Sequence, residues 1–277
     1  MINFDGNCFS GFKDAPEELI NTITSLPVHT HHLIAFRGKI TLLEDHYFSM
    51  MAALRRSRVE IPMHFTLEFF QEQLDLLNDS NHNKVDFQKL SLKFYRKQDP
   101  TLNSIVTSIC FLMQIDQTWW KTETSDMALY KDYYIFANDY SNRFQTNASL
   151  RNLGKIFAYE NGFGAALLLN DQKRLAESTH GAVFLFEHER IKTPALSEGT
   201  VDDVLRKSFI NFLKNDRQIE VVETEIPVFS IQQAQEMFLI SSSQGFTHIN
   251  QFRKKKFKTK MFDQLLAHFL DHLKNQL

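Results

Sequence analysis

Phenylalanine is the residue that most constrains how this chain can fold, because 26 of its 277 residues are Phe while only 7 are Tyr and 2 are Trp. A phenyl ring carries no polar atom that would favour hydration, so most of these rings must lie in a core. A chain of this length can build such a core without disulfides or a structural metal, and the length is typical of two domains or one large domain. We therefore expect extensive apolar packing.

The charge balance and the cysteines narrow the class of protein. The chain has 31 Lys and Arg against 33 Asp and Glu, which argues against nucleic acid as a partner because such binding depends on neutralising phosphates. Cys8 and Cys110 form no C-x-x-C pair, so we expect neither a disulfide framework nor a zinc cluster. No window approaches roughly 18 consecutive apolar residues, and MINFDGNCFSGFKD has no signal-peptide pattern. We expect a cytoplasmic protein without a membrane partner.

The first 115 residues alternate between the period of about 2 typical of strands and the period of about 3.6 typical of helices. Gly38 separates two apolar runs and supplies the turn of a β-hairpin, Pro62 ends the helical segment that follows, and Thr66 is a good N-cap for another. The expected elements are a hairpin over 33–44, helices over 45–58 and 67–77, and strands over 89–96 and 104–115. Together they predict a small α+β domain over 1–115.

Residues 116–126 lose periodicity and gain charge, so we interpret them as an interdomain linker. Its tandem Trp119 and Trp120 favour packing between domains over stacking on a ligand. A larger domain is expected over 127–277, and its mixed strands and helices are typical of a barrel-like α/β or α+β unit. The expected strands are 127–137, 164–169, 182–186, 190–193, 219–225 and 236–241, and the expected helices are 147–160, 201–214, 231–235 and 260–275.

Two polar runs are candidate sites in their own right. The run HTHH at 29–32 has the ligand type of a metal site but no acidic or cysteine partner at ligand spacing, so we favour exposed or locally hydrogen-bonded histidines. The run RKKKFK at 253–258 could bind phosphate or nucleic acid, but acidic residues balance it elsewhere and a solvated turn is favoured. The chain has no P-loop, no G-x-S-x-G and no Rossmann fingerprint.

Five short segments are more informative together than singly. They are RGKITLLEDHYFSMMAALRRSRVEIP at 37–62, ALLLND at 166–171, LAESTHGAVFLF at 175–186, KTPALSEGTVDDVLR at 192–206 and AQEMFLISSSQGF at 234–246. In order and spacing they resemble the class IV, or fold-type IV, family of pyridoxal phosphate enzymes. That family includes branched-chain and D-amino-acid aminotransferases and aminodeoxychorismate lyases, and the resemblance covers nearly the whole chain.

The resemblance carries expectations about fold and ligands. It implies a two-domain D-amino-acid aminotransferase-like fold of the α+β (α/β) class, with a small α+β domain and a larger barrel-like α/β domain. It also implies pyridoxal phosphate as the cofactor, a twofold homodimer, and a small amino-acid-like or keto-acid-like ligand.

The residue that the resemblance aligns with the catalytic lysine is not a lysine. Pyridoxal phosphate needs a lysine amine to form a Schiff base and to move the Cα proton. By the nearly ungapped count Gln145 takes that position, and a gapped alternative puts Ala148 there; no Lys occurs between Lys131 and Lys155. Because an amide cannot form a Schiff base, we expect Gln145 to be inactive.

The phosphate-binding motifs also differ. The H-x-x-R motif of the family appears as His46 to Ser49, so a hydroxyl replaces the arginine. The helix start that cradles phosphate corresponds to Asp203, Val204 and Leu205, and Asp202 with Asp203 would repel a dianion there. The T-G-T loop appears as residues 240–242 and keeps one hydroxyl, that of Ser242. We therefore expect weak or lost cofactor binding, and we interpret Thr200 with Asp203 as a capping-box variant that begins the helix over 201–214.

Glu177 is retained in the position where the family holds the pyridine nitrogen protonated. Taken alone it would be an ordinary strand-end carboxylate, but within LAESTHGAVF we favour a cofactor-type position by descent. His180 lies in the same loop and we favour an ordinary hydrogen-bonded loop residue over a ligand contact. We carry Glu177, Ser242, Ser49, Val204 and Leu205 forward as the cofactor-type positions.

Three interpretations follow. We favour a class IV aminotransferase-like protein that has lost pyridoxal phosphate catalysis and acts as a binding or non-catalytic homologue. The alternative is an active aminotransferase or 4-amino-4-deoxychorismate lyase, in which another residue, first of all Lys155, is the Schiff-base lysine. Whether the chain is an enzyme is left open by the sequence. A chance match by an unrelated protein is the least favoured.

Overall fold

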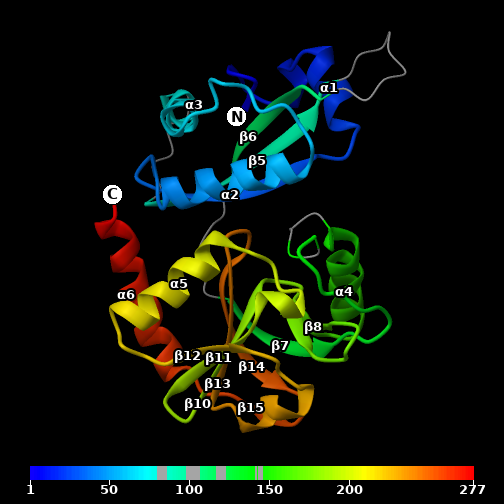
Figure 1. Ribbon diagram of the computed structural model, residues 1–277, viewed down its shortest axis with the longest axis vertical. Helices are drawn as coiled ribbons and strands as arrows, with labels where there is room; N and C mark the ends of the chain where they lie inside the picture. Colours follow the sequence, from blue (N-terminus) through cyan, green and yellow to red (C-terminus); the bar gives the residue numbers. More distant parts are fainter. Residues whose placement is uncertain (80–85, 98–106, 117–122, 141, 143–145) are drawn as a thin grey trace. The chain divides into compact units, whose positions relative to one another are not determined.

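The computed structural model describes residues 1–79, 86–97, 107–116, 123–140, 142 and 146–277 (Figure 1). The chain forms two compact units, residues 1–119 with 276–277 and residues 120–275. Each unit has a sheet of its own with helices packed on it, which confirms the expected α+β class. Trp119 and Trp120 lie outside the described residues.

The first unit is built on an antiparallel sheet with the strand order β2-β1-β6-β5-β3-β4. Its elements are β1 (Ile2–Phe4), β2 (Asn7–Phe9), η1 (Phe12–Asp14), α1 (Glu17–Ile23), β3 (His29–Phe36), β4 (Lys39–Ile40), α2 (Leu43–Arg56), α3 (Leu67–Asp79), β5 (Phe87–Arg96) and β6 (Ile109–Asp116). The predicted hairpin is confirmed: Arg37 and Gly38 form its turn with positive φ angles of 49° and 87°. β1, β2 and α1 were not predicted; β1 and β2 have three residues each, too few to show a period.

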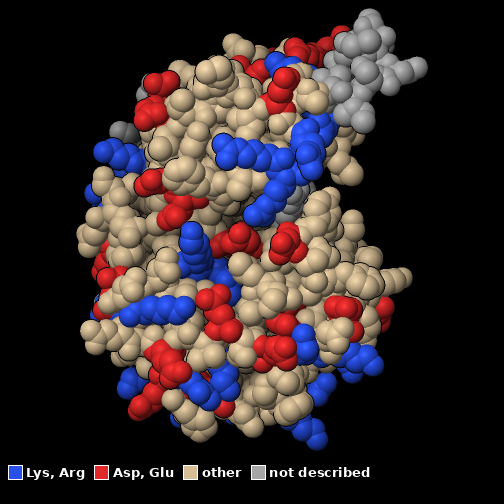
Figure 2. Space-filling view, viewed as in Figure 1, with Lys and Arg blue, Asp and Glu red and all other residues tan. Residues whose placement is uncertain are grey.

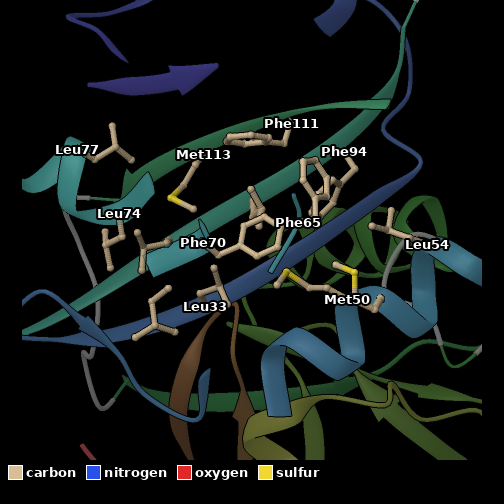
Figure 3. Close-up of a cluster of buried hydrophobic side chains, with 14 of the residues drawn as sticks. Leu33, Met50, Leu54, Phe65, Phe70, Leu74, Leu77, Phe94, Phe111 and Met113 are labelled. Atoms are coloured by element: carbon tan, nitrogen blue, oxygen red, sulfur yellow. The ribbon is translucent and has the colours of Figure 1, made fainter. Parts of the chain in front are cut away.

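The core of the first unit is an aromatic cluster between the sheet and the helices α2 and α3 (Figure 3). Phe65 and Phe70 have ring centroids 5.3 Å apart, and Phe70 also contacts Phe111 and Phe94 edge-on. The apolar spacing on each helix explains the packing, since Met50 and Leu54 on α2, and Phe70, Leu74 and Leu77 on α3, are fully buried. Phenylalanine burial therefore defines this core, as the composition predicts.

The second unit is built on a mixed sheet with the strand order β12-β11-β10-β13-β14-β7-β8-β9, and β15 pairs with β14. Its elements are β7 (Glu123–Leu129), α4 (Ala148–Glu160), β8 (Ala165–Leu169), β9 (Leu175–Ser178), β10 (Ala182–Glu187), β11 (Arg190–Pro194), η2 (Leu196–Glu198), α5 (Val204–Asn215), β12 (Val221–Thr224), η3 (Val228–Gln233), β13 (Glu236–Ser241), β14 (Gly245–Phe252), β15 (Lys255–Lys256) and α6 (Lys260–Asn275). The terminal strand β9 lies back against β10 and β11, so the sheet curls into a half-barrel. This is the barrel-like architecture that the sequence predicts.

Helices α5 and α6 lie side by side and cover one face of this sheet (Figure 1). Phe184 on β10 stacks on Phe238 on β13 with ring centroids 5.4 Å apart, and Phe209 of α5 meets both rings edge-on. Phe269 of α6 contacts Phe209 at 5.0 Å. Phe184 and Phe238 have no exposed area, in agreement with the expectation that most Phe rings lie in a core.

Several boundaries in the second unit differ from the expectation. β7 begins at Glu123, within the interval assigned to a linker, and ends at Leu129 rather than at 137. β14 was not predicted, because its first five residues are all buried and show no alternation that a single sequence would reveal. β15 is the second strand of a hairpin whose turn contains Arg253, so RKKKFK lies in an exposed hairpin, as favoured.

The surface agrees with the near-neutral composition. Lys and Arg side chains are interspersed with Asp and Glu on the face shown in Figure 2. Within the described ranges, no helix combines the length and the apolar composition needed to cross a membrane.

Candidate functional site

Glu177 lies at the end of β9 and is completely enclosed, with 1% of its side chain exposed. Its Oε1 accepts a hydrogen bond from Arg151 Nε on α4 at 2.7 Å. Its Oε2 accepts a hydrogen bond from the backbone N–H of Val201 at 3.2 Å. Each carboxylate oxygen therefore accepts a hydrogen bond from the chain itself.

The close approach of α4 to the sheet brings Arg151 to Glu177. Gly154 allows this approach: a Cβ at that position would lie 2.8 Å from Thr179 Cγ2 and 3.0 Å from Leu168 Cδ2. Arg151 precedes Gly154 by about one turn, so both lie on the buried face of the helix. Burial raises the pKa of Glu177, and the charge and hydrogen bond of Arg151 oppose that rise.

Asp203 is the N-cap of α5 and makes more contacts than a cap requires. Its Oδ1 accepts from the backbone N–H groups of Leu205 at 2.9 Å and Arg206 at 3.2 Å. The same oxygen accepts from the hydroxyl of Ser242 at 2.9 Å, and Oδ2 accepts from the backbone N–H of Ser242 at 3.0 Å. One carboxylate therefore joins the start of α5 to the turn between β13 and β14.

The environment of Asp203 both penalises and stabilises its charge. Burial raises its pKa, and the hydrogen bonds from Ser242, Arg206 and Leu205 oppose that rise. The positive end of the α5 dipole also favours an anion at this position. The donors that converge at the helix start are therefore already bonded to the chain's own carboxylate.

At the beginning of α5, the structure differs from the expectation for Thr200 and Asp202. The helix begins at Val204 with Asp203 as its cap, so the assignment of Thr200 as the N-cap was wrong. Residues 201–203 lack helical structure, and the Asp203 side chain bonds the first free N–H groups itself. Asp202 was expected beside Asp203 at the helix start, but its side chain is exposed and only its backbone N–H is bonded, to the carbonyl of Asn142.

The neighbouring turn residues are bonded locally. His180 accepts or donates at Nδ1 to the Thr179 hydroxyl at 3.0 Å, and its backbone N–H donates to the Ser178 hydroxyl. Burial, with a smaller contribution from the charge of Lys155, lowers the pKa of His180 to about 4. His180 is thus a hydrogen-bonded turn residue, as expected, and neutral at pH 7.

The remaining predicted positions are dispersed. Gln145 lies outside the described residues, and the alternative position, Ala148, is exposed at the first residue of α4. Ser49 is half-buried on α2 and belongs to the first unit. Glu177, Ser242, Val204 and Leu205 all belong to the second unit, where Asp203 joins Ser242 to Leu205 and Val204 is buried.

Sequence reasoning missed Arg151. The signal was present, because Arg151 shares the buried face of α4 with Gly154 and Ala158. A charged side chain on an otherwise apolar helix face requires a buried partner of opposite charge. The spacing of these three residues therefore indicates an ion pair, although it does not identify Glu177 as the partner.

The histidine run forms a chain of hydrogen-bonded rings in the first unit. His29 Nε2 lies 3.4 Å from His31 Nδ1, and His31 Nε2 lies 2.8 Å from His46 Nδ1 on α2. Exposure was the wrong expectation for His29 and His31, which are buried, and hydrogen bonding was the right one. Each nitrogen of His31 faces a different ring, and among the residues that the structure describes no group of three His, Cys, Asp or Glu could hold a metal.

Burial governs the protonation of these rings. It lowers the pKa of His46 to about 3. It also lowers the pKa of His31 well below its ordinary value, and the charges of His46, His29 and His32 add to that effect. Burial therefore disfavours the protonated form of His31 and His46.

A half-barrel that carries the five sequence segments in this order indicates a class of protein. The family model described as amino-transferase class IV matches residues 32–252, and the chain belongs to that family. A probable branched-chain-amino-acid aminotransferase of Aquifex aeolicus is 28% identical over 104 residues, which are 38% of this chain and 33% of that protein. A second such protein, from Thermotoga maritima, is 29% identical over 91 residues. The matched region thus spans about a third of each curated relative.

Solved structures support the fold at low identity. The branched-chain amino acid aminotransferase of Thermobaculum terrenum in its PLP form has a TM-score of 0.85 at 16% identity, covering 100% of this chain and 94% of that one. A putative 4-amino-4-deoxychorismate lyase of Legionella pneumophila has a TM-score of 0.77 at 15% identity, covering 88% and 90%. These neighbours establish the two-domain class IV aminotransferase fold.

The contacts of Glu177 and Asp203 bear on whether these residues fit pyridoxal phosphate, the cofactor that the family implies. Each oxygen of Glu177 accepts one hydrogen bond from the chain, and one of the two donors is a guanidinium, which places a positive charge where the ring nitrogen would also carry one. A phosphate dianion needs free N–H and O–H donors, but those of Leu205 and Ser242 bond to Asp203. The arrangement can hold elements of the fold together, and no catalytic step through the cofactor follows from it.

Proposed function

We propose that this chain is a class IV aminotransferase-like protein without pyridoxal phosphate catalysis, which acts as a binding or non-catalytic homologue. The family implies pyridoxal phosphate as the cofactor of the fold. The observation that carries the proposal is the buried pair of Arg151 and Glu177, because it places a cation against the carboxylate that would hold the ring nitrogen. Two cations facing each other across one carboxylate would repel, so Arg151 disfavours a protonated pyridine there.

Three further positions support the proposal. Gln145 cannot form a Schiff base, and Ser49 offers a hydroxyl where the family has a bidentate guanidinium. Asp203 holds a half-buried carboxylate at the helix start where a phosphate would require free donors. Loss of one such residue could be compensated elsewhere, whereas the differences at the lysine, the arginine and the cradle act in the same direction as the Arg151 guanidinium beside Glu177.

An absorbance and trapping experiment tests the proposal. The purified protein is incubated with pyridoxal phosphate, reduced with borohydride and digested for mass spectrometry, beside an active class IV aminotransferase as the positive control. We expect no internal-aldimine absorbance and no pyridoxyl-lysine peptide. A yellow protein with the cofactor on a defined lysine would contradict the proposal.

Restoration of the family residues provides a second test. Gln145→Lys alone should not recover activity, because Arg151, Ser49 and Asp203 still disfavour the ring and the phosphate. The combination of Gln145→Lys, Ser49→Arg and Asp203→Gly should bind the cofactor more tightly than any single change. Fluorescence titration with pyridoxal phosphate compares the variants, and equal affinity in all of them would show that these positions do not form the site.

The alternative function is an active aminotransferase or 4-amino-4-deoxychorismate lyase that uses Lys155. The observation in its favour is that Lys155 lies on α4, about one turn beyond Arg151, and is close enough to influence the pKa of His180. Lys155→Ala distinguishes the two functions. If the unmodified protein traps pyridoxal phosphate and Lys155→Ala abolishes the trapping, the alternative is correct.

We also propose a homodimer, by analogy with the family, and a small amino-acid-like or keto-acid-like ligand. Sedimentation velocity at micromolar concentration should give a dimer, and a monomer alone would contradict this assembly. A cytoplasmic location is part of the same proposal, and fractionation of cells that produce the protein tests it.

A further inference from the structure

We propose that Asp203 permanently takes the structural place of a bound phosphate and thereby ties α5 to the β13–β14 turn without any cofactor. This inference deepens the proposed function, because it explains how a chain that does not hold pyridoxal phosphate keeps the cofactor-binding region folded. The carboxylate of Asp203 is the anion that the start of α5 requires. In its absence, phosphate is the class of ligand that can take its place.

The contacts of Asp203 go beyond those of an ordinary N-cap. An N-cap side chain satisfies one or two N–H groups of its own helix. Asp203 does so with Leu205 and Arg206, but it also accepts two hydrogen bonds from Ser242, 39 residues further along the chain. Four hydrogen bonds from two distant elements thus converge on one carboxylate, which is the arrangement that these elements would offer to a small external anion.

The charge of Asp203 is needed at this place. Three of the four donors are backbone N–H groups, which cannot turn away when the acceptor is lost. An unsatisfied buried donor carries its full desolvation cost, and the positive end of the α5 dipole adds to the demand for negative charge. Burial raises the pKa of Asp203, and the hydrogen bonds from Ser242, Arg206 and Leu205 oppose that rise. These donors therefore stabilise the ionised carboxylate against the cost of its desolvation.

Removal of the side chain should therefore create a demand for an external anion. Asp203→Gly is the suitable variant, because glycine is well tolerated at an N-cap and the backbone there is extended, with φ −103° and ψ 131°. Asp202→Gly is its matched control, since it removes the same charge from the exposed neighbouring residue. Asp203→Gly with Ser242→Ala removes a donor from the created site.

Anion rescue tests the inference. The thermal midpoint and calorimetric binding are measured with inorganic phosphate at pH 7.5, and sodium chloride of equal ionic strength is the reference. Phosphate should raise the midpoint of Asp203→Gly and bind it saturably, at least about tenfold more tightly than it binds the wild type or Asp202→Gly. The added Ser242→Ala change should abolish most of that gain.

The opposite results are equally clear. The inference is overturned if phosphate does not stabilise folded Asp203→Gly, or if it stabilises Asp202→Gly equally. It is also overturned if the wild type binds phosphate saturably and the Ser242→Ala change removes that binding. If Asp203→Gly does not fold, Asp203→Ser keeps a capping hydroxyl without the charge and must show the same rescue. A failed rescue leaves the proposed function intact, whereas a trapped aldimine in the wild type removes the proposed function.

Discussion

The two units bury polar groups in opposite ways. The first unit encloses a chain of imidazoles, His29, His31 and His46, that bond to one another, and burial lowers the pKa of His31 and His46. The second unit encloses the Arg151–Glu177 ion pair and holds the half-buried carboxylate of Asp203, and each of these charges meets a partner from a distant segment. A neutral network needs only its hydrogen bonds, whereas a buried charge is tolerated only with a complementary charge or several donors.

This difference suggests that a chain can keep the fold of its family while the residues of the cofactor site change. By the family resemblance, the charges of Glu177 and Asp203 lie at the positions aligned with the ring nitrogen and the phosphate. In the proposed function these residues satisfy the two positions without a ligand. The histidine chain of the first unit is instead sensitive to pH, because burial disfavours protonation of His31 and His46.

The largest expected effect tests whether the two cores are equivalent. Phe238→Ala in the second unit should lower the free energy of unfolding by about 3–5 kcal/mol, because its ring is fully buried between Phe184 and Phe262. Phe70→Ala, in the aromatic cluster of the first unit, should cost a similar amount. Chemical denaturation measures both. A value near zero for either would show that its core adapts to the cavity.

The second effect tests the buried charges. Arg151→Met should destabilise the second unit by about 3 kcal/mol, because it leaves Glu177 enclosed without its cation. This value is at the lower end of the range for broken buried pairs, since Val201 still donates to Glu177. Urea denaturation gives the change in free energy.

A double variant provides the control for Arg151→Met. Arg151→Met with Glu177→Gln should recover most of the stability, because the amide is neutral and can still accept from Val201. If the double variant is as unstable as the single one, the cost comes from lost packing of the arginine and not from an unbalanced charge.

Most of the fold was predictable from the sequence for physical reasons. Long amphipathic helices such as α2, α3 and α6 have periods that a single sequence displays, and the turn at Gly38 requires a positive φ angle. The strand β14 was not predictable in this way, because burial on both faces removes the alternation.

The site was predictable only in part. The motif order selected Glu177, Ser242 and Asp203 as candidates, but it could not reveal that Asp203 bonds Ser242 or that Arg151 bonds Glu177. Those contacts join residues 39 and 26 positions apart, and their geometry depends on how the sheet curls. The sequence therefore indicated which charges were changed, and the structure explains how those charges are satisfied.

The third effect concerns pH and should distinguish the units. The pKa of His46 is lowered from 6.5 to about 3, so this residue does not affect stability above pH 6.5, and it destabilises the first unit progressively as the pH falls from 6.5 towards 3. Between pH 7 and pH 5 the loss should be about 2 kcal/mol for His46, and His31 acts in the same direction.

The second unit should respond less over the same interval. His180, with a pKa of about 4, also destabilises it below pH 6.5. The raised pKa values of Glu177 and Asp203 have the opposite effect on stability. As the pH falls, protonation removes the desolvation cost of each charge and so favours the folded state. Hydrogen exchange at pH 7 and pH 5 should show β3 and α2 losing more protection than α5 and β13, and His46→Gln should reduce the difference. Equal losses would refute the contrast between the units.

The smallest effect examines the contact that positions Arg151. In an exposed helix, replacing Gly by Ala stabilises by up to about 1 kcal/mol. Gly154→Ala should instead destabilise by about 1 kcal/mol, because the new Cβ would lie 2.8 Å from Thr179 Cγ2. The energy of this steric overlap exceeds the gain in helix propensity. Thr179 cannot readily rotate away, since its hydroxyl accepts from the N–H of Ala166 at 3.1 Å.

Asn152→Ala, at an exposed position of α4, is the control and should stabilise slightly. Thermal denaturation compares the two, and a gain in stability for Gly154→Ala would mean that α4 can move away from β8 without cost.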